Sequence, residues 1–86
     1  MSVDRRVPDE VDACIGRRVR ARRRQLNFSL QQLAAQLGVW FQQVQKYEAG
    51  LHRISAGTLF QIAVALETQV DYFFQDLPDE RPSRKR

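Results

Sequence analysis

Residues 30–49 of the chain read LQQLAAQLGVWFQQVQKYEA, and this stretch decides the fold. Its apolar residues recur at helical spacing, and they are Leu33, Leu37, Val39, Val44 and Tyr47. Ala34 is small where a second helix must cross closely, and Gly38 lies in the joint between the two segments. Two helices that cross at roughly 90–120° after a short turn need these features together. We therefore predict a helix-turn-helix, whereas an ordinary helical hairpin would tolerate a longer joint and a larger residue at position 34.

Local signals predict where these two helices begin and end. Ser29 is a good N-cap, and Gln32 three residues later completes a capping box. Gly38 can adopt the left-handed conformation that ends a helix at its C-terminus. We therefore expect one helix over residues 30–37 and the next over residues 40–49.

Three further helices are expected around this pair. Residues 9–26 place apolar side chains on one stripe, with arginines covering the rest. Ser55 is the N-cap expected for a helix that runs to about residue 66, and a short helix is expected to begin at Asp71. The predicted fold class is all-α, with five helices. Residues 1–8 are interpreted as a flexible N-terminal arm, residues 9–77 as the domain and residues 78–86 as a disordered charged tail.

Composition excludes several classes of protein. The chain has 86 residues, which is enough for one small domain, and it contains no paired carboxylates, nucleophile constellation or glycine-rich phosphate loop typical of an enzyme. Cys14 has no thiol partner, and the lone His52 has no metal-ligand partners of the usual kind, so no metal site, cofactor or small-molecule ligand is expected. The longest apolar run, residues 62–66, is far shorter than the ~20 residues of a membrane span. Since no signal peptide is visible either, a cytoplasmic protein is expected.

Positive charge is concentrated in the centre of the chain. The net charge is +4, yet residues 15–66 hold eight cations and a single acid, Glu48. Such a field on a small domain is typical of a protein that binds a polyanion, although a solvated cationic helix face would give the same totals.

The helix at 40–49 is predicted to present a glutamine-rich face to solvent. With Val44 and Tyr47 facing the core, helical geometry places Gln42, Lys46 and Ala49 on the opposite side. Glutamine amides pair bidentately with adenine, and lysine reaches guanine acceptors or a phosphate. This face therefore suits the major groove of DNA, although a merely soluble helix face would also be polar.

Glu48 is predicted to point inward, since it lies only about 40° from Val44 around the helix. A guanidinium from the helix at 9–26 could then meet it bidentately. The alternative is a surface acid near many arginines, whose interactions would contribute only ~0–1 kcal/mol.

The stretch LGVWFQQVQKYEAGLHRISAGTLFQIAVAL, followed by VDYFF and preceded by IGRRV at residues 15–19, resembles the phage-repressor-like (Cro/Xre) helix-turn-helix family. The resemblance covers about residues 15–77. It implies a compact five-helix, lambda-repressor-like domain that binds double-stranded operator DNA. It further implies a homodimeric, nucleoid-associated regulator of transcription, most often a repressor acting on a palindrome.

The resemblance also implies roles for individual residues. By position, the base-reading residues are Phe41, Gln42 and Lys46, with Gln43 beside them. The residues that match backbone-contacting positions are Ser29, Trp40 and Arg53. Arg23 and Glu48 match an ion pair that fixes the first helix against the recognition helix. Two departures from the family pattern are Leu30, which replaces a glutamine, and Trp40, which replaces a serine or threonine N-cap.

A homodimer is expected because one recognition helix covers only a few base pairs. The expected contact region follows the fourth helix and contains Val70, Tyr72, Phe73 and Phe74. Two alternatives stay open: the DNA-binding antitoxin of a toxin–antitoxin pair, and a protein-interaction adaptor that has lost DNA binding. Leu30 and Trp40 are the residues that favour the adaptor.

Overall fold

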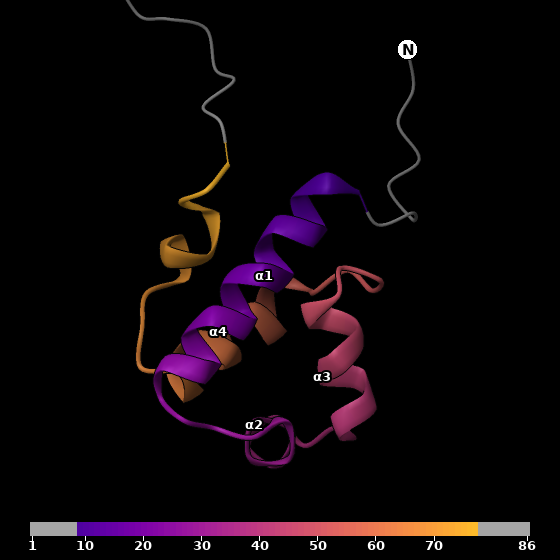
Figure 1. The fold of residues 1–86 in the computed structure, drawn as a ribbon, viewed down its shortest axis with the longest axis vertical. Coiled ribbons are helices and arrows are strands. Elements are labelled where there is room, and N and C mark those ends of the chain that lie inside the picture. Colours follow the sequence, from indigo (N-terminus) through magenta and orange to yellow (C-terminus); the bar gives the residue numbers. More distant parts are fainter. Residues whose placement is uncertain (1–8, 78–86) are drawn as a thin grey trace, which may run out of the picture.

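A computed structural model describes residues 9–77 of the chain. Its elements are α1 (Glu10–Gln25), α2 (Leu30–Leu37), α3 (Phe41–Glu48), α4 (Ala56–Ala65) and the 3₁₀ helix η1 (Val70–Phe74) (Figure 1). Residues 9–77 contain no strand, so the prediction of an all-α fold is confirmed. The arm predicted at residues 1–8 and the tail predicted at residues 78–86 lie outside the described residues.

The prediction of a fifth α-helix from Asp71 was wrong. Residues 70–74 form a 3₁₀ helix, in which Tyr72 N donates to Gln69 O at 3.1 Å. Five residues give little of the hydrogen-bond cooperativity that sustains an α-helix, and no side chain caps this segment at Gln69. Burial of Phe73 holds the segment in place instead, since that ring is 0% exposed.

The predicted helix caps are confirmed. Ser29 Oγ accepts from Gln32 N at 3.0 Å, while Gln32 Oε1 accepts from Ser29 N at 2.7 Å, which completes the capping box of α2. Ser55 Oγ accepts from Thr58 N at 3.1 Å at the start of α4. Gly38 ends α2 with φ +71°, in the left-handed region.

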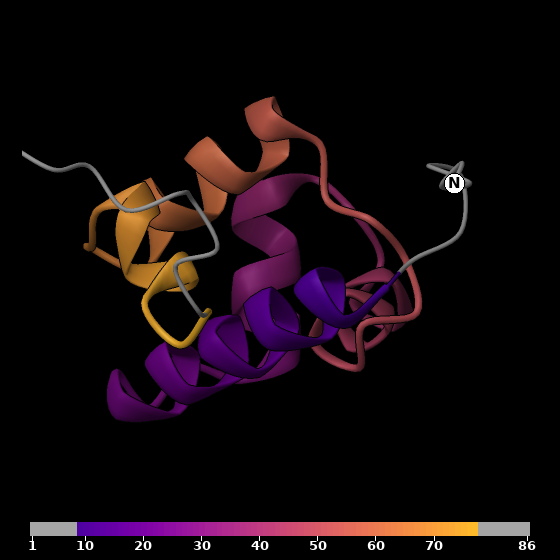
Figure 2. The ribbon, with the colours of Figure 1, turned by 90° about the horizontal axis from the view of Figure 1, so that it is seen from above.

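Every element contributes to one core. Figures 1 and 2 show α1 lying across one side of the molecule, α4 on the opposite side, and α3 and η1 at the two flanks. The largest fully buried side chains are Val19, Leu33, Val44, Ile62, Leu66 and Phe73. Because all of the helices bury residues in the same core, α3 is held as part of the domain and not as an independent helix.

Inward-reaching arginines of α1 tie it to the segment that follows α4. Arg22 Nε donates to Leu66 O at 2.8 Å, at the end of α4. Arg18 Nε donates to Tyr72 O at 2.9 Å, and its guanidinium carbon lies 3.9 Å from the centroid of the Tyr72 ring. These cations therefore stabilise the fold, and the net charge overstates the positive charge that is available to a partner.

Candidate nucleic-acid interface

The outer face of α3 is polar and accessible. Val44 is 1% exposed and anchors the inner face, while Gln42 and Lys46 on the opposite side are exposed. Gln43 is half-buried at the edge of this outer face. No carboxylate of α3 lies there, because the single acid of the helix, Glu48, is 9% exposed on the inner side. The structure thus brings together amides and an ammonium group, the donors and acceptors suited to base edges.

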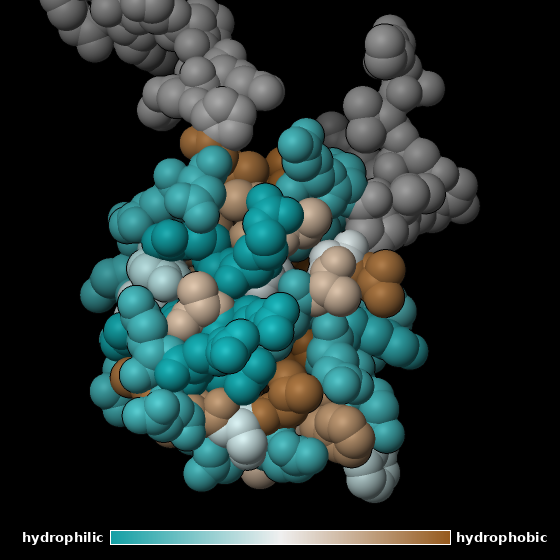
Figure 3. Space-filling view, in the orientation of Figure 1, coloured by the Kyte–Doolittle hydropathy of each residue, from teal (hydrophilic) through white to brown (hydrophobic). Residues whose placement is uncertain are grey.

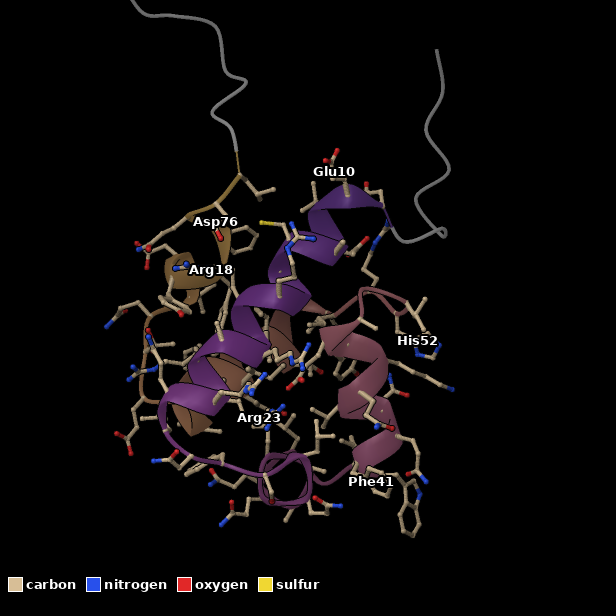
Figure 4. All side chains as sticks on the ribbon, viewed as in Figure 1. Glu10, Arg18, Arg23, Phe41, His52 and Asp76 are labelled. Atoms are coloured by element: carbon tan, nitrogen blue, oxygen red, sulfur yellow. The ribbon has the colours of Figure 1, made fainter. Side chains whose placement is uncertain are left out.

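Gln43 is held by a residue that the sequence did not single out for this role. Its Nε2 lies 3.0 Å from His52 Nδ1, in the loop between α3 and α4. Figure 4 shows His52 on the side of α3 that faces away from α1. The loop has no periodic pattern, so nothing in the sequence placed His52 beside this glutamine.

The N-terminal end of α3 carries the two large aromatic residues. Trp40 is 82% exposed and makes no side-chain cap hydrogen bond. Phe41, labelled in Figure 4, is half-buried and packs against the core. The two rings therefore differ: Trp40 is free to contact a partner, whereas most of the Phe41 ring supports the fold.

The inner face of α3 is joined to α1 by an ion pair. Arg23 Nε lies 2.6 Å from Glu48 Oε2 and Arg23 Nη2 lies 3.0 Å from Glu48 Oε1, a bidentate arrangement. Their side chains are 11% and 7% exposed. Arg23 Nη1 also donates to Phe28 O at 2.7 Å, so the same guanidinium reaches the connection into α2. Figure 4 shows Arg23 projecting from α1.

Gly16 permits the close approach of α1 to α3. A Cβ at this position would lie 2.7 Å from the carbonyl oxygen of Glu48 and would also clash with the carbonyl oxygen of Tyr47. The sequence did contain a signal, since a glycine in the middle of an otherwise strong helical pattern often marks a close packing contact.

Two of the residues matched to backbone-contacting positions already have intramolecular partners. Ser29 Oγ accepts the cap hydrogen bond of α2, which leaves its hydroxyl hydrogen to donate. Arg53 Nε lies 3.2 Å from Oδ2 of Asp12, a carboxylate that is 8% exposed. Asp12 was not predicted from the sequence, because its partner is 41 residues away and no local pattern links the two residues.

Asp12 also completes the N-terminal cap of α1. Its Oδ2 accepts from Asp9 N at 2.8 Å, while Asp9 Oδ1 accepts from the backbone of Asp12 at 3.3 Å. This backbone hydrogen bond lowers the pKa of Asp9, and the nearby Arg53 guanidinium adds to the shift. One carboxylate thus connects the start of α1 to the loop after α3.

Further positive charge lies beside α3. Arg17, Arg20 and Arg24 are exposed on α1, and Figure 3 shows hydrophilic side chains over much of this face. A hollow of about 290 Å³ lies between α1, α2 and α3, and its lining residues are Arg20, Arg23, Leu30, Gln45, Glu48 and Ala49. The exposed arginines of α1 add positive charge to the surface of the domain, which favours a polyanion as partner.

Other classes of site find no support in the described part of the chain. Residues 9–77 contain no group of three or more histidine, cysteine, aspartate or glutamate side chains that could hold a metal ion. Among the same residues, no helix combines the length and the apolar character that crossing a membrane requires.

The comparison with known families agrees with this geometry. The model of a helix-turn-helix family matches residues 19–73, from the middle of α1 to η1. The chain belongs to this helix-turn-helix family. The match includes α2, the joint at Gly38 and all of α3, which are the elements of the helix-turn-helix predicted from the sequence.

Individual relatives and structures give the same result. The chain is 53% identical over 73 residues to an HTH-type transcriptional regulator, y4aM, of Sinorhizobium fredii (strain NBRC 101917 / NGR234); the match covers 85% of this chain and 51% of the relative. It is 53% identical over 74 residues to a transcriptional regulator in the ATPase CF(0) region of Rhodospirillum rubrum, which covers 86% of this chain and 68% of that one. Among solved structures, the P22 c2 repressor in complex with synthetic operator 9T is 27% identical, with a TM-score of 0.64. The match covers 69% of this chain and 89% of that one.

These matches confirm the resemblance to phage-repressor-like (Cro/Xre) regulators. The family model describes a helix-turn-helix, and the relatives that the chain matches are named as regulators of transcription. The chain spans about half the length of the first relative.

Proposed function

We propose that the outer face of α3 enters the major groove and reads base edges, and that the chain acts as a homodimeric, non-enzymatic repressor on a palindromic operator. The observation that carries the proposal is the division of α3 into two faces. Its inner face is fixed by Val44 and by the buried Arg23–Glu48 pair, while its outer face offers Gln42 and Lys46 to solvent. The similar P22 c2 repressor, whose structure is a complex with a synthetic operator, supports DNA as the partner. Such a regulator would act at the nucleoid, in the cytoplasm.

The base-reading roles divide by chemistry. Gln42 and Gln43 are proposed to pair with adenine, and Lys46 with guanine or a phosphate. Phe41 is proposed to contact a thymine methyl group with the edge of its ring that stays exposed. Trp40, Ser29 and the guanidinium of Arg53 are proposed to contact the sugar-phosphate backbone.

The test of this proposal is the base preference of a Gln42→Ala variant. The wild-type protein would first select its preferred duplexes from a random pool. The affinity of each protein for a selected duplex would then be compared with its affinity for duplexes that differ from it at one position. We expect Gln42→Ala to relax the preference at one position per half-site and to weaken binding to the preferred sequence by ~1–3 kcal/mol. Gln61→Ala, an exposed glutamine on α4, is the matched control and should leave the preference unchanged.

Two outcomes would contradict the proposal. If Gln42→Ala kept the full preference, the outer face of α3 would not be the reading surface. If the wild-type chain showed no salt-dependent affinity for any duplex, the domain would be a protein-interaction adaptor, since phosphate contacts necessarily weaken with salt.

The proposed dimer contact requires one correction. Phe73 was predicted to lie in it, but that ring is 0% exposed, and the ring of Tyr72 is covered by Arg18. The exposed large apolar side chains of α4 and η1 are Phe74 on η1, 39% exposed, and Phe60 and Val64 on α4, 61% and 63% exposed. Phe60 and Val64 are four residues apart and share one face of α4.

We therefore propose that α4 and η1 pair with a second copy, which would place two half-sites roughly 34 Å apart. Phe60→Ser combined with Val64→Ser should shift sedimentation toward the monomer and weaken operator binding, because two recognition helices would no longer bind as one unit. The control is Leu51→Ser, which removes an equally exposed apolar residue from a different surface. A wild-type chain that sediments as a monomer both free and on the operator would contradict the dimer.

A further inference from the structure

The loop after α3 contributes a side chain to the outer face of that helix. His52 Nδ1 lies 3.0 Å from the amide nitrogen of Gln43, and both groups are accessible at the surface. Because an amide nitrogen can only donate, Nδ1 is the acceptor of this contact, and the tautomer that fits the geometry carries its hydrogen on Nε2. The contact restrains the side-chain rotamer of Gln43 and also determines which end of its amide group faces the loop.

The atoms that remain available on Gln43 match one base. The amide has two N–H groups, of which His52 uses one, so one N–H and the oxygen are left. Adenine presents an acceptor at N7 and a donor at N6 in the major groove, and a glutamine amide pairs with both. If the amide were turned over, its oxygen would face Nδ1, and a hydrogen bond would then require the other tautomer of His52, which carries its hydrogen on Nδ1. The tautomer with its hydrogen on Nε2 therefore holds the amide in the orientation that the structure shows.

We infer that His52 is a positioning residue that fixes the amide of Gln43 for adenine and so sets base preference without contacting the base. The inference rests on the proposed function, because Gln43 must face the groove. In the free protein this exposed hydrogen bond competes with water. Inside a groove from which water is excluded, a hydrogen bond of the same geometry contributes more, so the effect belongs to the complex.

The experiment measures competition between duplexes that differ at one base pair, for five variants and the wild type. His52→Ala should reduce the preference for adenine at the position read by Gln43 by about 3- to 10-fold and leave the other positions unchanged. His52→Asn keeps an acceptor, Oδ1, at the place of Nδ1 and should restore most of that preference. Leu51→Ala alters an exposed neighbour in the same loop and should change nothing. In a Gln43→Ala background, His52→Ala should have no further effect on preference.

Three results would overturn the inference. An equal loss of affinity for all duplexes in His52→Ala would make His52 a phosphate contact. Equal behaviour of His52→Asn and His52→Ala would show that the acceptor at this position is irrelevant. Additive losses from Gln43→Ala and His52→Ala would show that the two residues act independently. If Gln43→Ala shifts the preference and His52→Ala does not, only this inference fails; if the wild type has no base preference, the proposed function fails with it.

Discussion

The C-terminal end of α3 lies against α1 so closely that Gly16 has no room for a Cβ, and there the Arg23–Glu48 pair is 11% and 7% exposed. The N-terminal end begins at Trp40, which is 82% exposed and gives its helix no cap. Both ends belong to a helix of only eight residues. A distance of about 12 Å, at 1.5 Å per residue, thus separates a tightly packed helix end from an open one.

The difference indicates how a short helix can be both rigid and available for binding. A helix of eight residues is not stable alone, so its conformation depends on the contacts at its anchored end. No side chain caps the other end, where the N–H of Gln43 donates to the backbone oxygen of Trp40 at 2.9 Å. The buried ion pair is therefore at the end of α3 that meets α1, and the exposed indole of Trp40 is at the other end.

The largest expected effect comes from removing the acid at the anchored end. Glu48→Ala leaves the buried Arg23 guanidinium without its carboxylate, and breaking a buried pair in this way costs ~3–5 kcal/mol. We expect a large fall in the melting temperature or loss of folding, measured by circular dichroism. Glu67→Ala is the control: the backbone oxygen of Glu67, and not its carboxylate, accepts from Arg22.

A double variant separates the charge from the contact. Arg23→Met with Glu48→Leu removes both charges and fills the space with apolar groups, so it should be more stable than Glu48→Ala alone. If Glu48→Ala and Glu67→Ala lowered the melting temperature by the same small amount, Glu48 would behave as a surface charge.

The next effect tests the helix crossing itself. Gly16→Ala places a methyl group against the backbone of α3, and overpacking of this kind destabilises by ~1–3 kcal/mol. The control is Gly57→Ala on α4, where an added Cβ meets nothing within 4 Å and helix propensity favours alanine. Chemical denaturation should show opposite signs for the two substitutions. If Gly16→Ala left the free energy of unfolding unchanged, α1 and α3 would be able to move apart without loss of stability.

The features predicted from the sequence are those encoded within a few residues. The caps at Ser29 and Ser55 and the left-handed Gly38 each depend on contacts or angles inside one turn, and all three are present. The inward direction of Glu48 follows in the same way from helical periodicity. Such features are local, so a pattern of residue types is enough to reveal them.

The features that the sequence did not predict depend on how the loops are folded. Asp12 meets Arg53 and Gln43 meets His52 only because residues 49–55 return the chain past the end of α3. No periodicity constrains that loop, so its partners follow from tertiary structure alone. The residues at 70–74 show the same limit: a short fifth helix was predicted there, but the segment has only five residues, is held by the burial of Phe73 and forms a 3₁₀ helix.

The smallest expected effect on stability concerns the N-terminal end of α3. Trp40→Ser should raise the free energy of unfolding and lower the affinity for DNA. Trp40 has φ −75° and ψ 150°, close to the angles of the two serine N-caps, Ser29 at −79° and 165° and Ser55 at −64° and 157°. A serine hydroxyl at position 40 would therefore reach the N–H of Gln43, and a cap of this kind contributes ~1 kcal/mol. If the indole lies on the DNA backbone, the same variant should lose affinity equally for all duplexes while keeping its base preference. Melting and competition experiments on one protein preparation measure both quantities. A variant that is more stable and binds equally well would show that the Trp40 side chain serves neither folding nor DNA binding. A variant that is more stable but binds more weakly would show that Trp40 contributes a DNA contact at the expense of a helix cap.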